Sequence, residues 1–305
     1  MSDSSNTPTI TSTLKRLNFQ PIDELKRSPS CAIYRGERRN DGEQVVVKIM
    51  VVEGSRTSNY RKFFAQDQLA QRKLRHATLV RMVQSTRTLE PNRIVLWMEY
   101  MEGGSLLDLI LSESEPLDET IARQYYRQIC DALKYMHAEN FSHKNIKCEK
   151  ILFNADRTIC KLADYALTRS CFPYSRQQPL LDGYYCQCPS AAYIAPEVLI
   201  QDSRPFDQRP YNPFRSDVYS AGVVLYVITH RQLPIREWNL RFWIIAQMKR
   251  KFTINSRLTI ELKELIESQL YPQPSVRPSM EEVVEFRWFT NVDPNHWSHQ
   301  NVRNN

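Results

Sequence analysis

Apolar positions in the first hundred residues come in short runs separated by turn signals. Residues 32–34 precede an Asn-Asp-Gly turn at 40–42, and the apolar run 44–50 follows it. Such runs on both sides of an Asp-Gly pair predict an antiparallel hairpin. The run 94–98 predicts a further buried strand. Residues 57–75 are polar with apolar side chains near helical spacing, which predicts one helix.

Beyond Gly103 and Gly104 the pattern becomes helical. Residues 117–137 carry apolar side chains at helical spacing, and Asp118 supplies an N-terminal cap and a negative charge against the helix dipole. The same pattern predicts three later helices, at 216–229, 258–268 and 279–286. Strands followed by helices predict an α+β chain, with a small β-rich lobe containing one helix and a larger, mainly helical lobe.

The two terminal stretches and the cysteines limit the classes of protein that the sequence can represent. Residues 1–17 are rich in Ser and Thr and predict a disordered tail, and the polar stretch 290–305 predicts a second tail. The polar start predicts no secretory signal, and the longest apolar run, 218–229, is too short to span a bilayer. Seven scattered cysteines without a C-x-x-C pair favour neither a zinc site nor disulfides. A cytoplasmic location follows, with the nucleus as the alternative.

The net charge of +7 is concentrated near the start of the chain. Residues 14–76 hold fourteen Lys or Arg and seven Asp or Glu, which accounts for the whole excess. A basic face there could bind an acidic protein partner or a phosphorylated segment. The alternative is ordinary solvated surface. Nucleic acid is not expected as a partner, since no nucleic-acid-binding motif accompanies the charge.

The stretch 142–153 reads Ser-His-Lys-Asn-Ile-Lys-Cys-Glu-Lys-Ile-Leu-Phe. It resembles the catalytic loop of the protein kinase superfamily, His-Arg-Asp-Leu-Lys-x-x-Asn followed by apolar residues. His143 and Lys147 match that pattern, whereas Lys144, Asn145 and Lys150 depart from it. The resemblance extends over residues 18–289. It implies the two-lobed kinase fold, with the smaller lobe at 18–101 and the larger at 102–289.

The same resemblance implies a nucleotide site. Val45-Val46-Val47-Lys48 is similar to the family's Val-Ala-Ile-Lys strand, in which the lysine holds ATP phosphates. Asp67 falls where a glutamate should pair with that lysine, and Gln66 is the alternative register. The remaining purine-contacting and hinge positions fall on Ile33, Val46, Met98, Glu99, Met101 and Leu152. Apolar side chains at these positions are also what a lobe core needs.

The glycine-rich loop of the family is missing. Lys26, Ser28 and Cys31 stand where its glycines belong, and Pro29 removes one backbone amide. Glycines in such a loop let backbone amides approach phosphate without interference from side chains. The chain has only seven glycines in 305 residues, about a third of ordinary usage. Weak binding of ATP is therefore expected.

Asn145 stands at the position of the catalytic aspartate. An amide is not a useful base near neutral pH, and general-base catalysis contributes about 10²- to 10⁴-fold. Because the transition state of phosphoryl transfer is loose, an amide oxygen could still orient a hydroxyl. Asn145 and Lys147 are the candidate catalytic residues, and any turnover through them should be poor.

Lys150 replaces the asparagine that ligates the second magnesium ion, whereas Asp164, the first metal ligand, survives. A lysine ammonium competes with a divalent cation and can pair with Asp164 instead. At about 4 Å and an effective dielectric near 20, such a pair is worth on the order of 4 kcal/mol before desolvation. The alternative is that Lys150 points into solvent. Mg²⁺ is expected through Asp164 only.

At other positions of the family motifs, some characteristic residues are lost and others are retained. Lys144 lacks the bidentate grip of arginine on an activation-loop phosphate, and Cys186 stands at the usual phosphate-acceptor position. The resemblance implies that Arg277 is the buried partner of Glu197 and that Asp217 ties down the catalytic-loop backbone. Retained structural residues beside lost catalytic ones predict a folded domain with an altered active site.

Residues 146–149 and 161–164 resemble most closely the testis-specific serine kinases of the calcium/calmodulin-kinase group. The leading hypothesis is a pseudokinase, which acts as a scaffold or allosteric partner of an active kinase or of its substrate. The alternative is a weakly active Ser/Thr kinase that uses Lys48, Lys147, Asp164 and Asn145. Neither hypothesis calls for a membrane or a nucleic acid.

Overall fold

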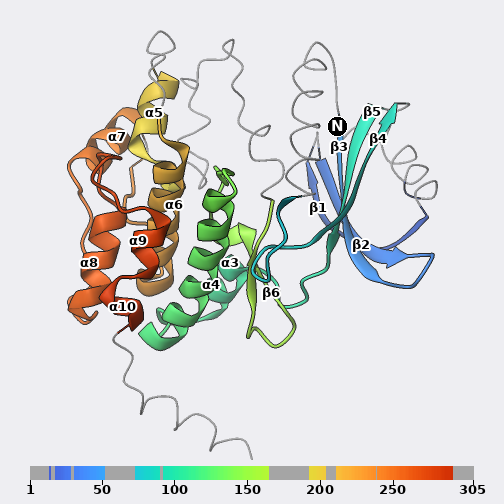
Figure 1. Cartoon of the computed structure of the whole chain (residues 1–305), viewed down its shortest axis with the longest axis horizontal. Helices are drawn as coiled ribbons and strands as arrows, with labels where there is room; N and C mark the ends of the chain where they lie inside the picture. Colours follow the sequence, from blue (N-terminus) through green and yellow to red (C-terminus); the bar gives the residue numbers. More distant parts are fainter. Residues whose placement is uncertain are drawn as a thin grey trace, which may run out of the picture. The chain divides into compact units, whose positions relative to one another are not determined.

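The computed structural model describes residues 14, 18–28, 31–51, 73–89, 92–164, 192–203, 211–237 and 239–290. The chain divides into two compact units, residues 1–102 and 103–305. The first is built on strands and the second is mainly helical, so the predicted α+β class is confirmed (Figure 1). The predicted helix at 57–75 lies almost wholly outside the described residues.

The smaller unit contains one antiparallel sheet with the strand order β1-β2-β3-β5-β4. Its strands are β1 (Phe19–Ser28), β2 (Cys31–Arg38), β3 (Gln44–Val51), β4 (Met82–Leu89) and β5 (Asn92–Glu99). The predicted hairpin is the β2–β3 pair, and the predicted buried strand is β5. Gly42 closes the hairpin at φ +71°, a left-handed conformation that glycine adopts without steric cost.

Alternate side chains of these strands form the core of the smaller unit. Val45, Val47 and Ile49 of β3 point to one face and are buried there. Phe19 packs edge-on against Trp97 in the same cluster, with ring centroids 5.5 Å apart. Leu14 is also buried in this core, so one residue of the stretch expected to be a polar tail belongs to the folded unit. The rest of 1–17 lies outside the described residues.

The larger unit contains helices and one short antiparallel pair of strands. The described helices are α3 (Leu106–Ser112), α4 (Glu119–Ala138), α5 (Pro196–Ser203), α6 (Pro213–His230), α7 (Leu240–Met248), α8 (Ile260–Gln269), α9 (Met280–Val284) and α10 (Arg287–Thr290). A 3₁₀ turn, η2 (Cys148–Lys150), leads into β6 (Ile151–Phe153), which pairs with β7 (Cys160–Leu162).

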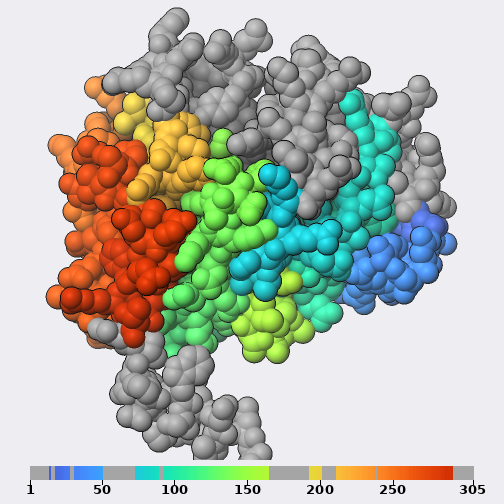
Figure 2. All heavy atoms as spheres, viewed as in Figure 1, coloured from blue at the N-terminus to red at the C-terminus, as the bar shows by residue number. Residues whose placement is uncertain are grey.

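Helices α4 and α6 organise this unit. The Asp118 carboxylate accepts the Thr120 N–H at 2.7 Å and begins α4, as predicted. The buried stripe of α4 faces β7, α9 and α10, and in Figure 2 the green surface of α4 lies between those elements. Helix α6 is buried along residues 217–229 and contacts both α4 and α8. Helices α6, α8 and α9 correspond to the three later helices predicted from spacing.

Tertiary contacts create elements that the hydrophobic pattern did not predict. Strand β4 is largely polar and exists through its pairing with β5. Helix α7 is apolar on almost every side, so no helical period marks it. None of the described helices has the length and hydrophobicity that crossing a bilayer requires.

Candidate functional site

Asp217 of α6 holds the backbone of the stretch that resembles a catalytic loop. Its two carboxylate oxygens accept the N–H groups of His143 and Lys144, each at 2.7 Å. The Nε2 atom of His137, in the last turn of α4, lies 3.0 Å from the same carboxylate. The predicted tie between Asp217 and this loop is confirmed. The sequence reasoning missed His137, whose signal is a histidine at the end of the helix that precedes the loop.

The environment of Asp217 keeps it ionised. Complete burial by itself raises the pKa of a carboxyl group. Here the hydrogen bond from His137 and the N–H donor of Lys144 outweigh burial, so the pKa of Asp217 is lowered from its usual value. A buried carboxylate with this set of donors fixes the positions of two consecutive backbone amides.

His143 links the loop to the strand that ends at Leu162. Its Nδ1 accepts the Asn145 N–H at 3.2 Å, so the ring proton is on Nε2, which donates to the Ala163 carbonyl at 2.9 Å. Burial lowers the pKa of His143 and keeps the ring neutral. The neutral ring thus joins residue 145 of the loop to residue 163, one position before Asp164.

Two side chains of the site stand on left-handed backbone. Lys144 has φ +63° and Asp164 has φ +66°. Aspartate is among the non-glycine residues that tolerate this conformation, whereas lysine adopts it less often. Such strain costs on the order of 1 kcal/mol or more, and the Lys144–Asp217 hydrogen bond helps to hold it.

Lys150 and Asp164 come together, as the sequence reasoning predicted. The Lys150 ammonium donates to Asp164 Oδ2, and only 22% and 12% of the two side chains are exposed. A backbone bond from the Ala163 N–H to the Lys150 carbonyl, 2.8 Å long, brings the two segments side by side. The alternative interpretation, in which Lys150 points into solvent, is wrong.

This arrangement does not fit a magnesium site. Mg²⁺ needs near-octahedral oxygen ligands, and it is bound in proteins by carboxylates together with phosphate or water. The Asp164 carboxylate already has a cationic partner in Lys150. The residues present therefore supply a salt bridge where the family resemblance implies a metal.

The other two loop candidates lie on either side of Ile146. Asn145 is half-buried, and its backbone N–H is the donor to His143. Lys147 Nζ lies 3.7 Å from Glu149 Oε1, a weak ion pair.

Leu152, a candidate nucleotide-binding residue, lies in β6. There it pairs with Lys161 and forms a bridge with Ser105.

In the smaller unit, the register of the sheet places four of the candidate nucleotide-binding residues on one face. Ile33 is opposite Lys48, and Val46 is opposite Met98. Because directly paired residues and alternate residues share a face, these four side chains point away from the core that holds Val45 and its neighbours. Lys48 and Met98 are each 8% exposed. The shared face is compatible with an apolar ligand and one nearby ammonium.

The candidate hinge residues lie at the end of this sheet. The Arg81 N–H donates to the Glu99 carboxylate at 2.6 Å, and the Glu99 N–H donates to the Arg81 carbonyl at 3.0 Å. Met101 is buried. Glu99 is therefore tied to the segment that enters β4.

The described part of the glycine-free segment is β structure. Lys26 pairs with Ile33, and Ser28 pairs with Cys31 across the β1–β2 ladder; Pro29 lies outside the described residues. Nearby basic side chains are engaged with acidic ones through the following pairs: Arg27–Glu24, Arg35–Asp23, Arg38–Asp41, Arg38–Glu43 and Arg81–Glu43. For Arg27, Arg35 and Arg38, which the structure describes, this pairing favours the solvated-surface interpretation.

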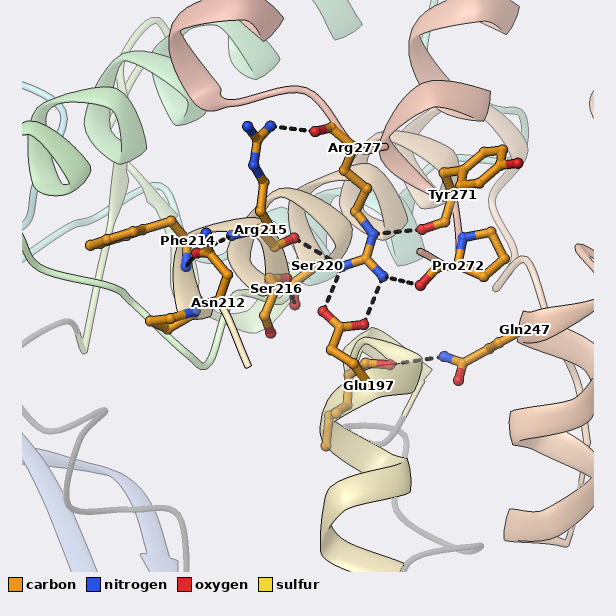
Figure 3. Close-up of polar contacts among 12 residues, drawn as sticks. Glu197, Asn212, Phe214, Arg215, Ser216, Ser220, Gln247, Tyr271, Pro272 and Arg277 are labelled. Atoms are coloured by element: carbon orange, nitrogen blue, oxygen red, sulfur yellow. Dashed lines mark hydrogen bonds and ion pairs between the residues drawn. The ribbon is translucent and has the colours of Figure 1, made fainter. Parts of the chain in front are cut away.

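A bidentate ion pair stabilises the larger unit, as the resemblance implied. Arg277 Nη1 and Nη2 donate to the two Glu197 oxygens at 2.6 and 2.7 Å (Figure 3). The buried guanidinium also donates to the carbonyls of Tyr271, Pro272 and Arg215. Complete satisfaction of its donors is what makes a buried arginine tolerable. Glu197 thereby fixes α5 to the segment before α9.

Three of the predicted residues cannot be placed. Asp67, Gln66 and Cys186 lie outside the described residues. The predicted Lys48–Asp67 pair and the activation-segment changes stay predictions.

Comparison with known proteins assigns the family. The sequence model of the protein kinase domain family matches residues 28–289, so the chain belongs to the protein kinase family. It is similar to an SNF-related serine/threonine-protein kinase of Homo sapiens, with 28% identity over 86% of this chain and 32% of that protein. It is also similar to CBL-interacting serine/threonine-protein kinase 20 of Arabidopsis thaliana, with 30% identity over 84% of this chain and 55% of that protein.

These relatives are longer than the present chain, which spans between a third and about half of their length. They place the chain among relatives of serine/threonine kinases. The finer resemblance to testis-specific serine kinases stays a prediction.

Proposed function

We propose that this chain is a pseudokinase, a kinase domain that regulates phosphorylation signalling by binding protein partners. The ion pair between Lys150 and Asp164 carries the proposal. It places a positive charge on the carboxylate that should ligate Mg²⁺, and phosphoryl transfer depends on metal ions to neutralise the developing charge. A metal would have to displace a largely buried ammonium before it could bind.

Asn145 supports the same conclusion, because it affects the catalytic base rather than the metal ligand. Its backbone is held by His143, yet its side-chain amide lacks the basicity of the carboxylate that the family uses. Loss of the base and obstruction of the metal ligand act on separate parts of the reaction. Restoring one of them alone should leave the other deficit in place.

In this proposal the kinase-like domain spans 18–289, with lobes at 18–101 and 102–289. It keeps a weak site for ATP at Ile33, Val46, Lys48, Met98, Glu99, Met101 and Leu152. Asp164 is the only ligand that the site could offer Mg²⁺, and Lys150 would have to be displaced first. The shared sheet face of Ile33, Val46, Lys48 and Met98 supports this assignment. The strand pairing of Lys26 and Ser28 supports weak rather than tight binding of phosphate.

A weakly active protein serine/threonine kinase is the second candidate. Its supporting observations are the buried Lys48 on that face and the retention of Asp164. Lys147 and Asn145 would then orient the substrate hydroxyl without removing its proton efficiently. Relatives with serine/threonine-kinase names are compatible with this candidate.

The partner in our proposal is another protein, namely an active kinase or its substrate. Several relatives carry the name "CBL-interacting", which indicates a protein partner for those kinases and supports one here. We further propose a cytoplasmic or nuclear location. No described cysteine forms a disulfide, which is compatible with a reducing compartment. Neither a nucleic acid nor a membrane has a role in the proposal.

A phosphotransfer assay with radiolabelled ATP tests the proposed function. The purified chain should transfer no phosphate to itself or to a generic protein substrate, with or without Mg²⁺. Asp164→Asn removes the surviving metal ligand. Asp131→Asn, a partly exposed carboxylate on α4 that pairs with Arg127, is the matched control. Transfer that Asp164→Asn abolishes and Asp131→Asn preserves would establish the second candidate instead.

A further inference from the structure

Helix α7 exposes three large apolar side chains. Phe242, Ile245 and Met248 are 58%, 36% and 49% exposed. Single exposed apolar residues are normal on protein surfaces and need no explanation. Three on one nine-residue helix are a local concentration that no other described helix has.

Helix geometry places these three side chains on one face. At 100° per residue, Phe242, Ile245 and Met248 fall within an arc of about 120°. Trp243, Ala246 and Gln247 fall on the other side and are buried. The Gln247 amide donates to the Ile194 carbonyl at 2.8 Å and anchors that inner side (Figure 3). The outer side of α7 is therefore an apolar surface on a helix that is already seated in the fold.

The charges that α7 and its C-terminal cap place on this surface have one sign. On the helical projection Arg241 falls between Met248 and Ile245, and Lys249 falls between Ile245 and Phe242. Both are exposed, and neither side chain forms an ion pair within the part of the chain that the structure describes. No carboxylate occurs from residue 239 to 251. We call Phe242, Ile245, Met248, Arg241 and Lys249 the outer α7 face.

We propose that the outer α7 face binds an acidic, amphipathic segment of a partner protein. Apolar side chains of the segment pack on Phe242, Ile245 and Met248, and its carboxylates lie against Arg241 and Lys249. Helical segments bind in this way through side chains spaced three and four residues apart. The inference names the partner chemistry for the proposed function, but binding at α7 does not require that the domain be inactive.

Charge argues against a second copy of the chain as the occupant. A two-fold symmetric contact puts the same patch on both sides of the interface. Arg241 and Lys249 of one copy would then face the same cations of the other, and juxtaposed like charges oppose association. A membrane surface is also disfavoured, because lasting attachment scales with buried apolar area and the outer α7 face offers only three side chains.

Selection from a peptide library tests the inference. The library displays helical 15-residue peptides with apolar and charged positions randomised, and the full-length chain is the target. We expect the enriched peptides to combine an apolar stripe with net negative charge. Their affinity, measured by fluorescence anisotropy, should fall roughly tenfold or more for Phe242→Ala and for Arg241→Glu. Ile260→Ala, an exposed apolar residue at the start of α8, is the matched control and should bind normally.

A charge swap makes the test specific. Replacing peptide glutamates by lysine should abolish binding to the wild-type chain and restore binding to a chain with Arg241→Glu and Lys249→Glu. Melting temperatures of all variants are compared first, and Ile245→Ala replaces Phe242→Ala if the latter is poorly folded. Enriched peptides that ignore the α7 variants, or no enrichment at all, would overturn the inference.

Two further experiments test whether a second copy of the chain or a membrane binds the outer α7 face instead. Light scattering that shows a concentration-dependent dimer, lost in Phe242→Ala, would assign the face to a second copy and overturn the inference. Cosedimentation with phosphatidylserine vesicles, lost in the same variant, would assign it to membrane and overturn it too. Phosphotransfer activity would overturn the proposed function while leaving peptide binding intact, so the two failures are distinguishable.

Discussion

The ammonium of Lys150 and the carboxylate of Asp164 form an ion pair with both side chains mostly buried. Lys150 stands at the end of η2 and Asp164 follows β7, and the backbone bond between Ala163 and Lys150 brings the two segments together. One substitution thus changes a divalent-cation ligand into half of a salt bridge. The main functional prediction follows from that change.

Restoring the family residues at two positions should recover metal-dependent nucleotide binding. Lys150→Asn combined with Asn145→Asp removes the competing ammonium and returns a carboxylate. Most of the Coulomb energy of the pair is offset by desolvation, so we expect a gain of about tenfold in affinity for Mg·ATP. Thermal shift and fluorescent-nucleotide titration measure it. Lys150→Asn alone should show most of the gain and Asn145→Asp alone little, whereas an unchanged double variant would mean that the glycine-free segment limits binding.

Removing Glu197 should destabilise the larger unit strongly. Glu197→Ala leaves the fully buried Arg277 guanidinium without its counter-ion. Breaking a buried pair in this way costs about 3–5 kcal/mol, which corresponds to a fall of roughly 10 °C in melting temperature. Glu264→Ala, an exposed glutamate on α8, is the control and should change little. Equal melting temperatures of the two variants would contradict the assigned role of the pair.

The hydrophobic pattern predicted those elements whose signal is local. Helix α4 has a regular apolar stripe and a capping Asp118, and its predicted and observed spans nearly coincide. The β2–β3 hairpin likewise has its turn and both strands within one short stretch. Strand β4 and helix α7 lack such a signal, because one is polar and paired only through β5 and the other is apolar on almost every side.

The sequence predicted those contacts of the candidate site whose residues align with motifs of the kinase family. Lys150–Asp164, Asp217 and Glu197–Arg277 follow from positions in that register, and their contacts are present. His137 is different, since its contact with Asp217 depends on where the end of α4 packs against α6. The outer α7 face depends on which side of an apolar helix is buried, and only the fold determines that.

Acidification should destabilise the fold through the buried His143 and the half-buried His230. Burial lowers the pKa of His143 and of His230 from the ordinary value of 6.5. Both rings are neutral in the folded chain and take up protons on unfolding, so the unfolded state binds more protons below about pH 6.5. The contribution of these two rings to stability should therefore be constant above that pH and fall as the pH decreases towards 5.

Thermal denaturation across this range measures the effect. His143→Gln and His230→Gln should each make the melting temperature less dependent on pH, even if each also lowers it. A wild-type melting temperature that stays constant from about pH 7 to about pH 5 would contradict the role of burial at these histidines.

Buried cysteines should resist alkylation in the native chain. Burial raises the pKa of Cys148 and of Cys160 to about 12, and it raises the pKa of Cys130 as well. The thiolate is the reactive form, so neither access nor ionisation favours reaction at neutral pH. Among the four described cysteines, iodoacetamide labelling with peptide mass spectrometry should modify the partly exposed Cys31 in the native chain and the three buried thiols only after denaturation. Native labelling of Cys148 as fast as Cys31 would show that the segment around η2 opens readily.

ATP binding to the wild-type chain, measured with and without Mg²⁺, tests the central claim most directly. If Lys150 occupies the charge position of the metal, Mg²⁺ will not raise the affinity for ATP, and it will not increase the thermal shift that ATP produces. The contrary result is a clear tightening of ATP binding by Mg²⁺ that Asp164→Asn removes. That result would mean that the metal displaces Lys150 and that the domain is equipped for catalysis.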